Sequence, residues 1–172
     1  MAVKEILVTR EYCLSCHNCE LACAVQHSKT GSLTGAMTEA VLPLSRINVE
    51  KTEEGAFPLQ CRHCNEPKCV QACMTGALFQ NEEKGLVMQE KEKCVGCWMC
   101  VMLCPFGSIE MDRRLGKALK CDRCEDRETP ACVEACPTGS ISFQSIYQFN
   151  RDRRRKYLVN LTPAAASKRE GL

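Results

Sequence analysis

The sixteen cysteines of this 172-residue chain fall into four groups of four, and the groups account for every cysteine. Two groups have the spacing C-x2-C-x2-C-x3-C, and the other two widen only the second gap, to four and seven residues. A tight triplet that closes with C-x3-C indicates thiolate ligands of a metal cluster. The groups are Cys13, Cys16, Cys19 and Cys23; Cys61, Cys64, Cys69 and Cys73; Cys94, Cys97, Cys100 and Cys104; and Cys121, Cys124, Cys132 and Cys136.

This spacing is that of the bacterial ferredoxin motif, in which thiolates hold [4Fe–4S] clusters. The first three cysteines of a group wrap one cluster, and we expect the fourth to lie on a helical turn that leads to a neighbouring cluster. Sixteen ligands, with four for each cluster, predict four [4Fe–4S] clusters and leave no cysteine over. The pattern therefore predicts a protein that carries electrons.

Three other uses of cysteine fit the pattern less well. A secreted disulfide scaffold is disfavoured because the chain opens MAVKEILVTREYC, without an apolar signal stretch, and its close triplets are poor disulfide partners. Zinc sites use two C-x2-C pairs, whereas two of these groups end in C-x3-C-P at Pro105 and Pro137. The C-x3-C-x2-C triplet of radical S-adenosylmethionine enzymes does not occur.

Charge and hydropathy argue against a nucleic-acid-binding protein and against a membrane-spanning one. The formal net charge of +2 counts cysteine as neutral, and thiolates with four oxidised cluster cores make it about −6. Nucleic acid binding is therefore disfavoured, and the basic stretch 151–156 predicts a solvated helix face or a docking patch. No run approaches the roughly 18 apolar residues of a membrane span. Oxidation-sensitive thiolates need a reducing compartment, so we expect a cytoplasmic protein of anaerobic metabolism.

Repeats around the cysteines predict an α+β fold with two bacterial-ferredoxin-like two-cluster units, one inserted within the other. The segments 73–78, 104–109 and 136–141 are near copies in which a glycine turn leads into a strand. Residues 77–80 and 86–89 read as a hairpin. We expect one contiguous unit at 57–112, which the split unit encloses. The split unit comprises 1–56 and 113–145, with strands at 6–9 and 141–143, and a C-terminal helix and tail follow at 146–172.

The nested arrangement predicts that each triplet shares its cluster with the fourth cysteine of the partner group. Pairing group one with group two and group three with group four is the alternative, and the 37-residue spacer between Cys23 and Cys61 makes it less natural. The nested ligand sets are Cys13, Cys16, Cys19 and Cys136; Cys121, Cys124, Cys132 and Cys23; Cys61, Cys64, Cys69 and Cys104; and Cys94, Cys97, Cys100 and Cys73.

The remaining segments carry less information. The spacer 28–60 is too long for a turn, so we expect it to cover a cluster or a partner surface, with a strand at 47–50. Group one lacks the glycine turn, and its helix should continue beyond Cys23. Residues 144–159 predict a helix, and 163–172 a frayed tail. No nucleophile elbow, phosphate loop, dinucleotide fingerprint or acid–base pair occurs, so we expect a non-catalytic subunit without catalytic residues.

Some residues near the cysteines are candidates for tuning the clusters. Because the cysteine count is complete, we expect the three histidines to donate hydrogen bonds to cluster sulfur or backbone, not to ligate iron. Trp98 is expected to shield a cluster from water. Five cations beside ligands either offset the cluster charge or form ordinary charged surface. The histidines and cations are His17, His27 and His63, and Arg62, Lys68, Lys93, Lys120 and Arg123.

Over residues 1–145 the chain resembles the four-cluster iron–sulfur subunits of molybdenum oxidoreductases and formate hydrogenlyase. It looks most like the electron-transfer subunit of nickel carbon monoxide dehydrogenase, on the segments Cys19–Ser28, Pro58–Cys64 and Cys94–Met102. The resemblance implies the nested ligand pairing. It also implies electron transfer from carbon monoxide dehydrogenase to a hydrogenase or flavin oxidoreductase. Ser15 departs from the family, where glycine is frequent after the first cysteine.

The alternative to this partner is a formate dehydrogenase, a hydrogenase or another molybdenum oxidoreductase complex, with the chain as its iron–sulfur subunit. A redox or iron sensor, which belongs to a different functional class, would need a regulatory output surface. No DNA-binding helix or strongly basic face supplies one in this sequence. The sequence therefore favours an electron carrier with a catalytic partner and a downstream acceptor, and without a membrane span of its own.

Overall fold

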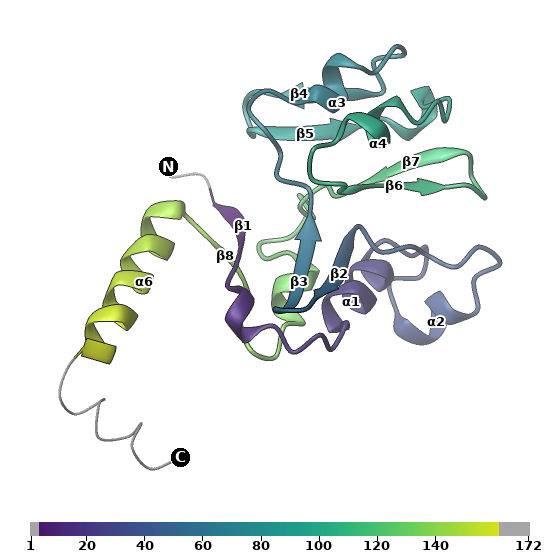
Figure 1. The fold of residues 1–172 in the computed structure, drawn as a ribbon. Helices are drawn as coiled ribbons and strands as arrows, with labels where there is room; N and C mark the ends of the chain where they lie inside the picture. The colour runs from purple at the N-terminus through teal and green to yellow at the C-terminus, as the bar shows by residue number, and fades with distance from the viewer. Residues whose placement is uncertain (1–3, 162–172) are drawn as a thin grey trace.

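The computed structural model describes residues 4–161, and antiparallel strand pairs joined by short helices form its framework (Figure 1). The strands are β1 (Glu5–Val8), β2 (Ile47–Thr52), β3 (Gly55–Gln60), β4 (Leu78–Asn81), β5 (Leu86–Gln89), β6 (Ile109–Asp112), β7 (Lys117–Lys120) and β8 (Ile141–Gln144). The helices are α1 (Asn18–Gln26), α2 (Leu33–Met37), α3 (Lys68–Gln71), α4 (Met99–Leu103), α5 (Ala131–Glu134) and α6 (Ile146–Leu161), with 3₁₀ turns η1 (Arg10–Tyr12) and η2 (Lys91–Lys93). The mixture of helix and strand agrees with the predicted class.

Three of the strand pairs are hairpins, and the fourth joins the first strand to the last. The hairpins are β2–β3, β4–β5 and β6–β7, whereas β1 pairs with β8, so that Glu5 faces Gln144 and Val8 faces Ile141. Figure 1 shows β1 and β8 side by side between α6 and the remaining elements. The predicted hairpin at 77–80 and 86–89 and the predicted strands at 6–9, 47–50 and 141–143 are confirmed to within one or two residues.

Two hairpin turns use the same chemistry at the same spacing. In the β4–β5 turn the Asn81 side chain accepts a hydrogen bond from the Lys84 N–H, and Gly85 has a positive φ of 62°. In the β6–β7 turn Asp112 accepts from the Leu115 N–H, at the same spacing, and also from the Arg114 N–H, and Gly116 has a φ of 61°. A side-chain acceptor followed by a glycine in the left-handed region fixes a tight reversal. The two turns therefore set the register of both hairpins locally.

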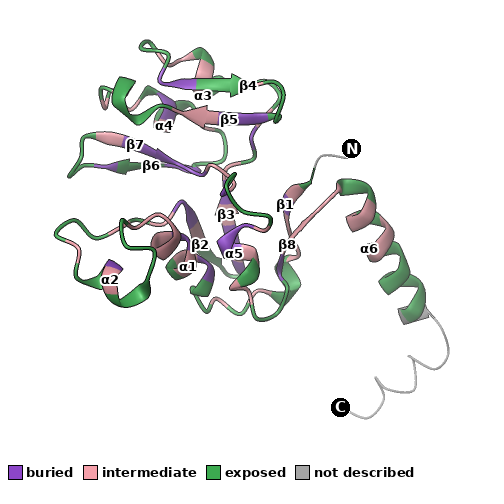
Figure 2. Ribbon diagram, turned by 180° about the vertical axis from the view of Figure 1, so that it is seen from behind, coloured by how far each residue is buried: buried purple, intermediate pink, exposed green. Residues whose placement is uncertain are grey.

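The core consists of two clusters in which cysteines replace much of the usual apolar side-chain volume. In the first, Cys19, Cys23 and Cys132 pack with Ile6, Ile47 and Ile141. In the second, Cys100 packs with Leu78, Ile109 and Ala118, and further cysteines surround them. Helix α1 packs against α5 in the first cluster and α3 against α4 in the second. Figure 2 shows the buried segments mainly on the strands and on α5. Each core cluster thus combines elements distant in sequence.

The helices end where the sequence around the last cysteine of each group requires it. Cys104 and Cys136 precede prolines, and a residue before proline is disfavoured in the helical region. Accordingly α4 ends at Leu103, and Cys104 is extended with φ −72° and ψ 113°. Cys23 has no such neighbour, and α1 continues to Gln26 as expected. The expectation that every fourth cysteine lies on a helical turn is wrong for Cys73, Cys104 and Cys136, which lie just beyond a helix.

The spacer between the first two cysteine groups contains α2 and the β2–β3 hairpin, and α2 was not predicted. The predicted unit boundaries at residues 57 and 112 fall in the hairpins β2–β3 and β6–β7, so strand pairing crosses both. Helix α6 confirms the predicted C-terminal helix and projects from the body (Figure 1). The predicted tail at 163–172 lies outside the described residues. Within residues 4–161, no helix combines the length and apolar character that a bilayer crossing needs.

Replacing Gly96 by alanine should destabilise the protein more than the same change at Gly76. Both glycines have a positive φ, 69° and 65°, which costs alanine about 1–2 kcal/mol. Only at Gly96 would the new Cβ also lie 2.4 Å from a backbone atom, the carbonyl oxygen of Gly116, whereas the space around Gly76 is open. Thermal unfolding of anaerobically purified protein measures the difference. An equal loss in both variants would show that the contact with Gly116 is unimportant.

Candidate metal centres

Three small cavities are each lined by four cysteines, three from one sequence group and the fourth from another. Two of these cavities lie at the second core cluster, where α3 packs against α4, and the third lies beside α1 and β8. The cysteines that line them are Cys13, Cys16, Cys19 and Cys136; Cys61, Cys64, Cys69 and Cys104; and Cys73, Cys94, Cys97 and Cys100. The structure thus brings together the cysteines of three predicted sets.

The remaining four cysteines, which form the fourth predicted set, are all buried and lie near one another. Burial and the neighbouring thiols of Cys121, Cys23 and Cys124 raise the pKa of Cys132 far above its ordinary value. Cys23 and Cys132 also share the first core cluster, because α1 packs on α5. Here too, three cysteines come from one group and one from another.

Burial favours the protonated form of several of these thiols when nothing is bound to them. Burial raises the pKa of Cys19 and Cys69 to about 11 and that of Cys121 to about 12. No disulfide joins any of the sixteen cysteines. Four converging thiols without a cation are a poor core, because they pack loosely and become mutually repelling anions when ionised. A bound metal removes both problems by replacing the protons.

Backbone N–H groups point at the sulfur of several fourth cysteines. Cys73 accepts from the Leu78 N–H at 3.4 Å, Cys104 from the Ser108 N–H at 3.4 Å, and Cys23 from the Arg46 N–H at 3.3 Å. Burial raises the pKa of Cys73, but this N–H and the Thr75 hydroxyl outweigh burial and lower it below its ordinary value. Donors directed at sulfur stabilise the thiolate, which is the form that binds a metal.

The loops between the first cysteines of each group coil tightly because several non-glycine residues adopt a left-handed backbone. Positive φ angles occur at Ser15, His63 and Arg123, at equivalent places in three groups, and Gly96 occupies that place in the fourth. At His63 and Arg123 the backbone N–H donates to the preceding cysteine sulfur at 3.4 Å. Non-glycine residues rarely adopt this conformation, so its recurrence indicates a functional constraint on the loops. Ser15 adopts this left-handed conformation although it is not a glycine.

Sets of four thiolates suit a zinc ion or an iron–sulfur cluster. The triplets decide between them, because a zinc site takes its ligands from two short pairs and leaves no role for the third cysteine of a triplet. Residues 52–146 match the family described as a 4Fe-4S dicluster domain. The chain belongs to this family. The cysteines of such a dicluster domain are cluster ligands, and the convergence of the thiols fits that role.

Curated relatives of the chain include iron–sulfur and electron transport proteins. An iron-sulfur protein of Rhodospirillum rubrum is 42% identical over 153 residues, which cover 79% of each chain. The putative electron transport protein YsaA of Escherichia coli is 34% identical, covering 90% of this chain and 98% of its own. The electron transport protein HydN of Escherichia coli is 32% identical, covering 88% and 95%. The similarity therefore extends over most of the chain.

The three histidines have different roles from one another. His27 hydrogen-bonds through Nδ1 to the Cys23 carbonyl at 2.7 Å, as expected for a donor to backbone. His17 pairs with the Glu20 carboxylate at 2.8 Å. The expectation that His63 donates to sulfur or backbone is wrong for its Nδ1, which accepts from the Val87 N–H at 3.1 Å. Burial, together with the charge of Lys120, lowers the pKa of His63 to about 2, so the ring is neutral.

The cations beside the ligands divide into two classes. Arg62, Lys68 and Lys93 are exposed and form ordinary charged surface. Lys120 is buried, and Arg123 is half-buried with its guanidinium donating to the Lys4 carbonyl at 3.1 Å. Only Lys120 and Arg123 are placed to act on the metal sites through a medium of low polarity. Trp98, half-buried, lines the cavity of Cys73, Cys94, Cys97 and Cys100, as expected for a shield.

A partly buried ionic network around Asp122 was not anticipated from the sequence. Asp122 accepts from His27 Nε2 at 3.2 Å and from the Arg46 guanidinium, and the Arg46 side chain is 8% exposed. Burial opposes the ionised carboxyl, but His27 and Arg46 lower the pKa of Asp122 below its usual range. The bonded acceptors at both nitrogens raise the pKa of His27 to about 9 in spite of its burial. This network ties the spacer to the buried cysteine set.

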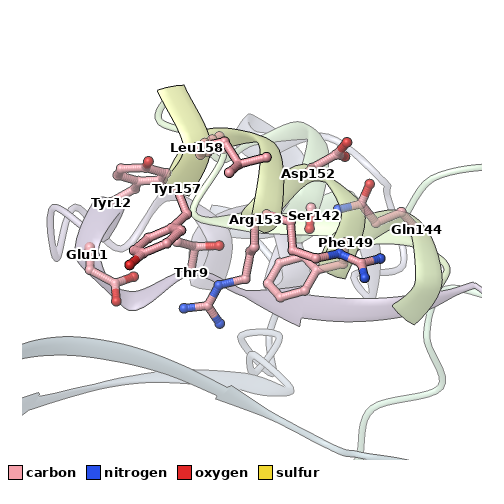
Figure 3. Close-up of a pocket in the computed structure, with 13 residues that line it drawn as sticks. Thr9, Glu11, Tyr12, Ser142, Gln144, Phe149, Asp152, Arg153, Tyr157 and Leu158 are labelled. Carbon is pink, nitrogen blue, oxygen red and sulfur yellow. The ribbon is translucent and has the colours of Figure 1, made fainter. Parts of the chain in front are cut away.

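A cavity of about 780 Å³ lies between α6, the turn η1 and the strand β8. Figure 3 shows Tyr157 and Leu158 of α6 near Tyr12, with Arg153 and Phe149 further along the same helix. Lys156 lies 4.8 Å from the centre of the Tyr12 ring, within the range of a cation–π contact. The lining holds no cysteine and no nucleophile–base pair among the described residues. Its geometry gives no indication of catalysis.

Replacing Asp122 by asparagine should destabilise the protein by about 1–3 kcal/mol, because the buried Arg46 guanidinium then loses its charged partner. The matched control is Glu54→Gln, which breaks the exposed pair with Arg10 and should cost at most about 1 kcal/mol. Thermal unfolding of both loaded variants, with their iron content, tests this. If Asp122→Asn is no less stable than Glu54→Gln, the network does not hold the spacer in place.

Proposed function

We propose that the chain is a non-catalytic electron carrier that holds four [4Fe–4S] clusters. The support is the convergence of all sixteen cysteines into four sets of four, each drawn from two sequence groups. The proposed ligand sets are Cys13, Cys16, Cys19 and Cys136; Cys121, Cys124, Cys132 and Cys23; Cys61, Cys64, Cys69 and Cys104; and Cys94, Cys97, Cys100 and Cys73. Bound clusters of this type exchange one electron at a time.

The arrangement proposed for these sets is a split ferredoxin unit that encloses a contiguous one. The pairing of β1 with β8 and of α1 with α5 supports it, because both contacts join the first cysteine group to the fourth. The contact of α3 with α4 joins the second group to the third. The hairpins crossing residues 57 and 112 favour wider boundaries for the contiguous unit, which would include β7.

The contacts between sets favour a linear order. Helix α1 carries Cys19 of one set and Cys23 of the next, and the second core cluster holds cysteines of the other two sets. Between the two pairs, Cys61 is close enough to Cys121 for the charge of its thiolate to help raise the pKa of Cys121, after the larger effect of burial. The inner sets then begin at Cys61 and Cys121, and the outer sets contain Cys16 and Cys97.

The outer sets reach the surface at equivalent positions. Cys16 and Cys97 are exposed, and the neighbouring Leu14 and Val95 are 68% and 65% exposed. The inner set around Cys121 is buried. Exposed apolar residues beside a redox site allow a partner to exclude water and approach closely. We therefore place electron entry and exit at these two ends.

The proposed catalytic partner is nickel carbon monoxide dehydrogenase, with a hydrogenase or flavin oxidoreductase as acceptor. The support is the sequence resemblance in Cys19–Ser28, Pro58–Cys64 and Cys94–Met102. The relatives YsaA and HydN are named for electron transport, and neither name specifies a carbon monoxide partner. The second candidate is a formate dehydrogenase, hydrogenase or other molybdenum oxidoreductase complex. We propose a cytoplasmic location and no role in nucleic acid binding.

Serine variants can test the ligand sets by iron content. The protein should hold about sixteen iron, and Cys104→Ser should lose about four. Combining it with Cys64→Ser should cause no further loss, because both variants affect the same cluster. Combining it with Cys97→Ser should double the loss. Iron and sulfide analysis of anaerobically purified protein provides the measurement, and a loss of only four iron in the Cys104–Cys97 double variant would refute the nested sets.

The partner is tested by rapid mixing under anaerobic conditions. Carbon monoxide and carbon monoxide dehydrogenase should bleach the visible absorption of this protein promptly, because electrons enter its clusters. Formate with formate dehydrogenase serves as the matched comparison. Prompt reduction by formate, with no reduction by carbon monoxide, would favour the second candidate. A protein that holds its iron but accepts electrons from neither enzyme would leave the ligand sets intact and would refute carbon monoxide dehydrogenase and formate dehydrogenase as partners.

A further inference from the structure

Lys120 is a buried ammonium group without a carboxylate partner among residues 4–161. It is the last residue of β7, and it is 3% exposed. Its Nζ donates to the Val87 carbonyl at 2.6 Å and to the Cys121 carbonyl at 2.7 Å, which are both neutral acceptors. An unpaired buried charge costs several kcal/mol unless other charges compensate it. Two carboxylates line the cavity beside Lys120, but Asp122 is paired with Arg46 and Glu125 with Lys84. Compensating Lys120 therefore calls for further negative charge nearby.

The two carbonyls that Lys120 binds belong to different metal sites. Val87 lines the cavity of Cys61, Cys64, Cys69 and Cys104, whereas Cys121 itself begins the other inner set. A cavity of about 120 Å³ beside Lys120 is lined by both Val87 and Cys121. The charge of Lys120 favours ionisation of the thiols of Cys64, Cys69 and Cys121, although their burial opposes it more strongly. Lys120 thus lies where the two inner sets meet.

His63 strengthens the polar character of this junction. The ring is 5% exposed, and its Nδ1 accepts from the Val87 N–H, so the proton of the neutral ring is on Nε2. Nε2 is buried and has no hydrogen-bond partner among the described residues. The backbone of Val87 is therefore bound on both sides, by His63 at its N–H and by Lys120 at its carbonyl. The contacts fix the ammonium group in one position.

We propose that Lys120 is the shared counter-ion of the two inner clusters and makes both of them easier to reduce. This inference rests on the proposed function, because four thiolates around an oxidised core carry a net negative charge that Lys120 can compensate. Reduction by one electron adds a further negative charge. A fixed cation in a medium of low polarity stabilises that charge and raises the reduction potential. Because their potentials are raised, the two inner clusters then hold electrons in the middle of the protein.

The strand that carries Lys120 also provides a matched control. Lys117, three residues earlier on β7, is half-buried, and its Nζ donates to the Cys94 carbonyl at 2.6 Å. It has the same side chain and the same kind of acceptor, but it lies beside an outer set. Neutralising Lys117 should therefore leave the potentials of the inner clusters unchanged.

The test compares Lys120→Met and Lys117→Met with the wild type by anaerobic redox titration, followed by electron paramagnetic resonance. Cys64→Ser and Cys97→Ser assign the signals to inner and outer clusters. In Lys120→Met we expect the ratio of reduced to oxidised inner clusters, at a fixed potential, to fall about tenfold, which equals about 59 mV for one electron. Unchanged inner potentials in Lys120→Met, or an equal shift in Lys117→Met, would overturn the proposal.

Two further variants keep the test decisive if Lys120→Met loses iron. Lys120→Gln keeps a hydrogen-bond donor without the charge, and its inner potentials should fall as in Lys120→Met. If neither neutral variant holds iron, full loading of Lys120→Arg would show that the site needs the charge. Failure of Lys120→Arg as well would attribute the loss to packing and overturn the proposal. Wild-type protein that lacks about sixteen iron would refute the proposed function instead, independently of Lys120.

Discussion

The convergence of thiols from distant parts of the chain is the constraint on which this fold depends. Cys19, Cys23, Cys100 and Cys132 occupy core positions that larger apolar side chains would fill in most domains. Without a bound cation these positions would hold small, weakly packing thiols, whose ionisation burial opposes. Under the proposed function, the free energy of ligation is therefore a large part of the free energy of folding. This explains how short strands and one-turn helices form a stable structure.

The same constraint accounts for the topology. The pairing of β1 with β8 brings together segments more than 130 residues apart, and such closure costs conformational entropy. An isolated two-stranded sheet with only four residue pairs contributes too little free energy to offset this cost. A cluster held by Cys13, Cys16, Cys19 and Cys136 would join the same two segments through covalent bonds to metal. Strand pairing and ligation then support each other at the ends of the chain.

Local features of the fold could be predicted from the sequence, and long-range ionic features could not. Cysteine spacing, the glycine of each turn and short apolar runs predicted the hairpin β4–β5 and the strands β1, β2 and β8. The sequence does not show that Lys93 is exposed and Lys120 is buried, because both lysines directly precede a cysteine. Likewise, Asp122 and Arg46 are 76 residues apart and carry no local signal of their contact. Helix α2 was missed because five residues are too few for a clear periodicity.

The two ends of the molecule have similar exposure but different surroundings, and this difference matters for a carrier that serves two partners. Beside the end with Leu14, α6 presents Arg153, Arg154 and Lys156 next to Tyr12. Beside the end with Val95, Lys93 pairs with Glu90 at 2.7 Å, so that cation is locally neutralised. Charge complementarity mainly governs the rate and the orientation of association. An acidic partner surface would thus be attracted to the α6 end, whereas recognition at the other end depends more on apolar contact.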